Sequence, residues 1–170
     1  MSALVAFLVA VNPPVIAGAL PRAVPMRTIS IAALISTALL ILAAVLSKPV
    51  LDLLDVSAPT FRVAAGAVLA VAGIRWVIVG AKPMDEQEPR ALTLLPRFFT
   101  PPLLAIAITV GVDDGVVTAS VAGAVALAAA VVAAIGRGQG LVWWSWSARL
   151  IGLAGVAVGL ALVVDGVKTV

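Results

Sequence analysis

Residues 28–47, TISIAALISTALLILAAVLS, form an apolar stretch of 20 residues without a charged side chain. About 20 apolar residues suffice for a helix to cross the hydrocarbon core of a bilayer. The rest of the chain has the same character, since 63% of its 170 residues are hydrophobic and only 11% are charged, against roughly a quarter charged in soluble domains. This composition nearly excludes a water-soluble globule and predicts an integral membrane protein.

Five further apolar stretches of similar length are bounded by proline, glycine or charged residues. They cover residues 3–24, 60–80, 92–112, 116–135 and 148–164. Residues 50–59 are typical of a short interfacial segment with a turn, and residues 82–90 form the one polar loop. We therefore expect a single all-α membrane domain, residues 1–170, with six transmembrane helices.

Several side chains that carry chemistry are missing from the sequence. The chain contains no histidine, cysteine or tyrosine, which excludes zinc, haem and iron–sulfur centres held by imidazole or thiolate ligands. No phosphate-binding loop, Ser–His–Asp set or pair of catalytic acids is visible in the sequence. We expect neither an enzyme, nor a metal site, nor a cofactor.

Basic residues gather in the loops after the first, third and fifth apolar stretches. They are Arg22, Arg27, Lys82, Arg90 and Arg137. The opposite side carries Lys48 and Lys168 together with several aspartates. Because basic loops stay in the cytoplasm, both termini are expected outside. The net charge of +3 is scattered over short loops, so it predicts orientation in the membrane and no binding of nucleic acid.

An internal repeat relates the two halves of the chain. Residues 11–20, VNPPVIAGAL, align with residues 99–108, FTPPLLAIAI, at an offset of 88 residues, and Arg62 aligns with Arg149 at an offset of 87. Each half contains three apolar stretches, so the second half must enter the membrane from the opposite side. The sequence predicts two inverted three-helix repeats, at about residues 1–81 and 91–170.

The two proline pairs of this repeat mark a candidate binding site. Asn12-Pro13-Pro14 and Thr100-Pro101-Pro102 each lie about nine residues into an apolar stretch, or about 13 to 15 Å deep at 1.5 Å per residue. Proline leaves carbonyl groups without a donor, and a helix that restarts after it presents free N–H groups. We expect a midplane site for a small polar solute, with a cation on the carbonyls. The alternative is two proline kinks packed against neighbouring helices.

Other polar residues lie within the apolar stretches or at their ends. Arg97, three residues before Thr100, is a candidate partner for an anionic group of the solute. Arg75, Arg62 and Arg149 are expected to anchor at the interface. Aspartates at the ends of apolar stretches are expected to be solvated; they are Asp113, Asp114 and Asp165. A stripe of small residues predicts close packing of the last helix within the molecule. It consists of Ala148, Gly152, Gly155 and Gly159.

Four parts of the chain resemble the MarC family of six-span bacterial membrane proteins, also called the neutral amino acid transporter family. They are Asn12-Pro13; residues 51–66, LDLLDVSAPTFRVAAG; Leu95-Pro96 with Thr100-Pro101; and residues 149–153, RLIGL, through Asp165-Gly166. The chain departs from the family in having Pro14 and Thr100-Pro101-Pro102 where glycines are usual, and in being shorter than most members. The resemblance implies a carrier in the bacterial cytoplasmic membrane, coupled to sodium ions or protons, for small neutral amino acids such as alanine and glycine.

Together these features predict a secondary transporter or exporter of a small polar solute. The residues expected to bind solute or ion are Asn12, Pro13, Pro14, Arg97, Thr100, Pro101 and Pro102. The expected partners are membrane lipids and the solute, while a second copy of the chain or a membrane-protein partner stays open. The alternative function is a non-transporting membrane subunit or a lipid-handling scaffold.

Overall fold

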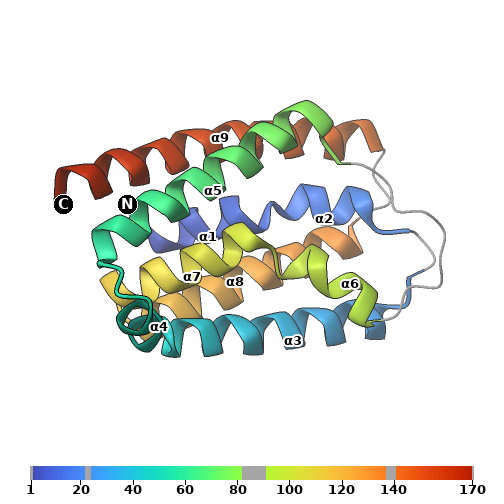
Figure 1. Ribbon diagram of the computed structural model, residues 1–170. Coiled ribbons are helices and arrows are strands. Elements are labelled where there is room, and N and C mark those ends of the chain that lie inside the picture. The colour runs from blue at the N-terminus through green and yellow to red at the C-terminus, as the bar shows by residue number, and fades with distance from the viewer. Residues whose placement is uncertain (1, 22–23, 82–90, 137–140, 170) are drawn as a thin grey trace.

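The computed structural model describes residues 2–21, 24–81, 91–136 and 141–169, and within these ranges it contains helices and no strand (Figure 1). The helices are α1 (Ala3–Val11), α2 (Pro13–Ala19), α3 (Met26–Val45), α4 (Ser47–Leu53), α5 (Ala58–Val79), α6 (Ala91–Phe98), α7 (Pro101–Asp113), α8 (Val116–Ile135) and α9 (Leu141–Thr169). The all-α prediction is confirmed.

Four of these helices, α3, α5, α8 and α9, are long and apolar enough to cross a membrane. A fifth span results if α6 and α7, which meet at an angle of 58°, are taken as one bent element. The remaining predicted span is divided into α1 and α2, which together cover only Ala3–Ala19. The structure therefore supports a multi-pass membrane protein with four or five spans by length, where the sequence predicted six.

Prolines decide where the broken helices stop and restart. Asn12 has φ 47° and ψ 71°, a left-handed conformation that ends α1, and Pro13 then occupies the first position of α2, where proline costs no hydrogen bond. Thr100 is extended, with φ −97° and ψ 155°, and Pro101 starts α7 in the same way. Helix α9 begins at Leu141, seven residues before the expected start at residue 148, because the Trp-rich segment ahead of that residue contains no proline or glycine.

The helices form layers in which the two broken elements lie in the middle (Figure 1). Helices α5 and α9 pair along one side, α3 lies along the other, and α3 also packs against α8. Both chain termini lie at one end of the bundle, which we call the termini end (Figure 1). Large side chains buried between the layers include Phe7, Phe98, Ile16 and Leu103, so both broken elements contribute to one core.

Glycines bring α5 and α9 into direct backbone contact. A methyl group placed on Gly66 would lie 2.5 Å from the carbonyl oxygen of Gly159, and one on Gly73 would lie 2.6 Å from that of Gly152. Such small-residue contacts let two membrane helices approach closely. The predicted packing of the small-residue stripe within the molecule is confirmed.

Candidate functional site

The main cavity lies between the two broken elements and α5. It has a volume of about 630 Å³ and is lined by residues of α1, α2, α5, α6 and α7. Cavities of roughly 300 to 1,000 Å³ are typical of small-molecule sites. The cavity is therefore the candidate functional site.

The second proline break contributes its side chains to this cavity. Thr100, Pro101 and Pro102 all line it, as does Arg97. The Thr100 hydroxyl accepts a hydrogen bond from the backbone N–H of Leu103 and donates one to the carbonyl oxygen of Ala10, both at 3.4 Å. Thr100 thus links the start of α7 to the end of α1 while remaining at the cavity wall.

The first proline break faces away from the cavity. Asn12 is fully buried, and its side-chain amide donates to the carbonyl oxygen of Ala148 at 3.1 Å while its Oδ1 accepts from the N–H of Val15 at 3.4 Å. Pro13 and Pro14 are buried as well, and the cavity wall is formed instead by their neighbours Val11, Val15 and Ile16. Asn12 therefore positions this wall without belonging to it.

Free N–H groups are not available where α2 and α7 restart. The first two residues of each helix are prolines, which carry no N–H. The next N–H groups are already bonded, since Val15 donates to the carbonyl of Asn12 at 2.9 Å and Leu103 to the hydroxyl of Thr100 at 3.4 Å. The N–H of Leu104 donates to the carbonyl of Thr100 at 3.0 Å. The expectation that these helix ends offer donors to a solute is wrong, so an anion in the cavity must be bound by side chains.

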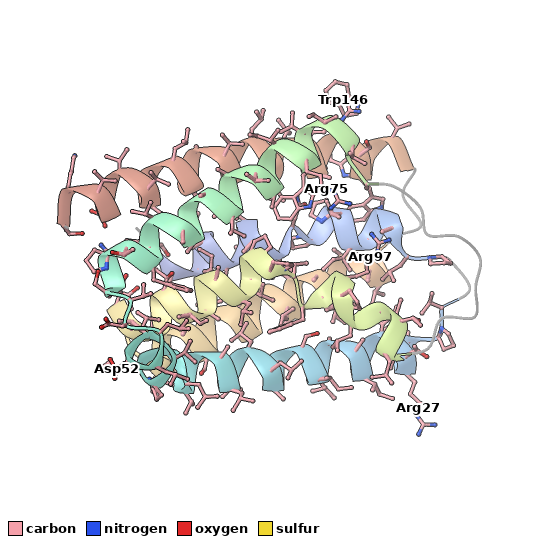
Figure 2. All side chains as sticks on the ribbon, viewed as in Figure 1. Arg27, Asp52, Arg75, Arg97 and Trp146 are labelled. Atoms are coloured by element: carbon pink, nitrogen blue, oxygen red, sulfur yellow. The ribbon has the colours of Figure 1, made fainter. Side chains whose placement is uncertain are left out.

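Two arginines supply such side chains. Arg75 of α5 and Arg97 of α6 both line the cavity, and both extend into the space between these helices (Figure 2). Neither guanidinium has an acidic partner among the residues that the structure describes. Arg75 was expected to be an interfacial anchor, but it shares one face of α5 with Val68, Ala72 and Val79. That spacing of three, four and seven residues is the sequence signal that could have placed it in the cavity.

The termini end of the bundle is closed by an ion-pair cluster. Arg62 of α5 contacts both carboxylate oxygens of Asp113, at 2.8 and 3.0 Å, and one of Asp165, at 2.8 Å. The cluster ties α5 to α7 and α9, where the sequence predicted an anchor and solvated acids. The repeat partner Arg149 lies over the Trp146 ring at 5.5 Å.

Removing Arg62 should loosen the termini end. We expect Arg62→Gln to lower stability by about 1 kcal/mol, the upper range for a partly exposed ion pair. Asp113→Asn should cost more than Asp165→Asn, because Asp113 is less exposed and makes two contacts. Thermal unfolding in mild detergent measures this order, and Asp114→Asn is the control. Equal effects of all four variants would contradict a specific cluster.

The chain matches no model of a known protein family, and it matches neither a curated protein nor a solved structure. The resemblance to the MarC family stays a prediction that rests on the quoted motifs.

Proposed function

We propose that this protein is a secondary transporter built from two inverted three-helix repeats, a short and divergent relative of the MarC family. Its solute occupies the cavity between α5 and the two broken elements. The described conformation is the one open toward the cytoplasm, with both termini outside. Four helices qualify as spans by length, or five if α6 and α7 are counted as one bent span. In the proposal α1 and α2 together form the sixth span, so that each repeat contains one broken span and two continuous ones.

The packing of helices supports the repeat. If α1 and α2 correspond to α6 and α7, α3 to α8, and α5 to α9, then most contacts occur twice. Helix α2 packs on α8 as α7 packs on α3, α1 packs on α8 as α6 packs on α3, and α2 packs on α9 as α7 packs on α5. Such exchange of partners is expected when a duplicated unit packs against its inverted copy.

The single observation that carries the proposal is a difference between the two repeats in how their first helices pack. Helix α1 packs against both α7 and α9, whereas its counterpart α6 makes little contact with α2 or α5 in the described residues. The other exceptions are α7 with α8, which follow each other at a short turn, and the contacts of α4, which has no counterpart among the described helices. The cavity occupies the space between α6, α2 and α5. It therefore lies where the repeat would otherwise place a packed interface.

Individual residues give the same result. A methyl group on Gly155 would lie 3.2 Å from Cγ1 of Val9, so α1 and α9 touch at the middle of α9. The repeat offsets relate Val9 to Arg97 and Gly155 to Val68, and these two residues both line the cavity. Helices α1 and α9 are therefore in contact, whereas the cavity separates their counterparts α6 and α5. A carrier would alternate by closing α6 on α5 while α1 separates from α9.

Two-sided labelling tests the carrier, and the chain is suited to it because it contains no cysteine. Val15→Cys places a thiol in the cavity wall. A membrane-impermeant maleimide should label it from the cytoplasmic side quickly and from the outside slowly, since the second state must be visited. Asp52→Cys and Arg27→Cys, exposed at opposite ends (Figure 2), are the one-sided controls. Labelling of residue 15 from one side only would overturn alternating access.

A lipid-handling scaffold is the second candidate, and one observation favours it. The lining residues Val71 and Val79 are 67% and 47% exposed, so apolar side chains stand at the mouth of the cavity. Labelling of Val15→Cys from the cytoplasmic side alone would support this function instead.

A further inference from the structure

We propose that the cavity binds an anionic amphiphile, that is, a carboxylate or phosphate group joined to an apolar body, with Arg75 and Arg97 holding the anionic group. This inference rests on the proposed function and names the substrate class of the same cavity.

The charge of the lining determines the sign of the ligand. Arg75 and Arg97 line the cavity, while none of the described residues that line it is acidic. A carboxylate or phosphate can accept two N–H donors from each guanidinium, which makes such contacts strong and directional. A zwitterionic amino acid would bring its ammonium group beside two cations, with only carbonyl groups to receive it. The lining therefore favours a ligand with net negative charge over a neutral amino acid.

The apolar walls of the cavity and its lateral opening determine the non-anionic part of the ligand. Apart from the two arginines, Trp76 and Thr100, the part of the lining that the structure describes consists of apolar side chains, prolines and one glycine. Lining residues of α5 extend from Val68 to Val79, which is about 17 Å along a helix. Because Val71 and Val79 are exposed at the mouth, the cavity opens sideways toward the hydrocarbon. An apolar chain can enter there from the membrane while its anionic group stays with the arginines.

The depth of the arginines fits this orientation. Arg75 is four residues before the end of α5 at Val79, or about 6 Å from the helix end, and Arg97 precedes the bend between α6 and α7. Basic pockets between transmembrane helices on the cytoplasmic side are a known way to bind lipid head groups. The same chemistry would accept a phospholipid or a free fatty carboxylate, and the experiment separates these sources.

Trp76 provides the readout because it lines the cavity beside Arg75. A protein carrying Trp143→Phe, Trp144→Phe and Trp146→Phe retains Trp76 as its one tryptophan. In phosphatidylcholine nanodiscs, brominated phosphatidylglycerol or brominated stearate at a few mole per cent should quench its fluorescence saturably. Brominated phosphatidylcholine at the same level should quench several-fold less. Selective quenching by either anion supports the site and identifies its source.

Arginine variants test the binding groups. Arg75→Gln and Arg97→Gln should each raise the half-saturating anion concentration by about tenfold, as expected for loss of a charge-assisted contact. Arg75→Lys should retain part of the affinity because it keeps the charge. Arg27→Gln, exposed at the surface away from the cavity (Figure 2), is the matched control and should change nothing.

Two results would overturn the ligand class: equal quenching by the anionic and zwitterionic lipids, or unchanged selectivity in the Arg75→Gln/Arg97→Gln double variant. The outcome is independent of the labelling of Val15→Cys. If quenching is selective but Val15→Cys is labelled from one side only, the anion site stands and the carrier function is wrong. If Val15→Cys is labelled from both sides but quenching is not selective, the carrier function stands and the ligand class is wrong.

Discussion

Replacing Gly73 with leucine should strongly destabilise the protein. A Cβ atom at this position would lie 2.6 Å from the carbonyl oxygen of Gly152 and 2.7 Å from the backbone nitrogen of Val156. Both atoms belong to the backbone of α9, so they cannot rotate away, and the two helices must separate. Overpacking alone costs roughly 1 to 3 kcal/mol, and loss of the α5–α9 contact adds to it. We expect a loss of at least about 3 kcal/mol.

The measurement is thermal unfolding of the purified protein in mild detergent. Gly136→Leu is the matched control, because a Cβ there would lie 3.7 Å from its nearest neighbour. Gly73→Ala sharpens the test, since alanine favours helix over glycine by about 1 kcal/mol and should nevertheless destabilise the protein at this position. Unfolding of Gly73→Leu and Gly136→Leu at the same temperature would show that the close α5–α9 contact is unimportant.

The second large effect is expected for Asn12→Ala. This change removes the buried amide that donates to Ala148 and the cap on the Val15 N–H. It also forces alanine into a left-handed conformation, at a cost of about 1 to 2 kcal/mol. A buried acceptor left without a partner costs about 1 to 3 kcal/mol, so we expect a total loss of about 2 to 5 kcal/mol.

Two further variants separate these contributions. Asn12→Gly tolerates the φ of 47° but lacks the amide, so its loss should fall between those of alanine and the wild type. Thr100→Ala should cost less than Asn12→Ala, because Thr100 has an ordinary extended backbone and both of its side-chain hydrogen bonds are long, at 3.4 Å. Thermal unfolding gives this ranking. Equal stability of the alanine and glycine variants would contradict a role for the backbone conformation.

Apolar stretches predicted the long helices well. The stretch at residues 116–135 coincides with α8 (Val116–Ile135), and the stretch at 28–47 is displaced by two residues from α3 (Met26–Val45). The helix breaks expected at both proline pairs are present, since α2 starts at Pro13 and α7 at Pro101. The sequence could not show the left-handed turn at Asn12 that joins α1 to α2. Helix α9 starts earlier than expected because residues 141–147 contain no proline or glycine to stop it.

The candidate site was less predictable because it depends on contacts between distant helices. Asn12 and Thr100 look equivalent in the sequence, yet Asn12 finds a buried partner in Ala148 while Thr100 stands at the cavity wall. Arg75 lines the cavity because α6 makes little contact with α5 among the described residues, which no single stretch reveals. Arg62, Asp113 and Asp165 lie far apart in the chain and meet only because α5, α7 and α9 converge.

The bond between Asn12 and Ala148 also has a consequence for biogenesis. The two residues are 136 positions apart, and the ribosome adds about 5 to 20 residues per second. The carbonyl that Asn12 requires is therefore made about 7 to 27 s after the amide itself. During that interval the Asn12 amide and the glycine face of α5 lie in the bilayer without their partners on α9. We expect it to depend on the insertion machinery until the last helix is released.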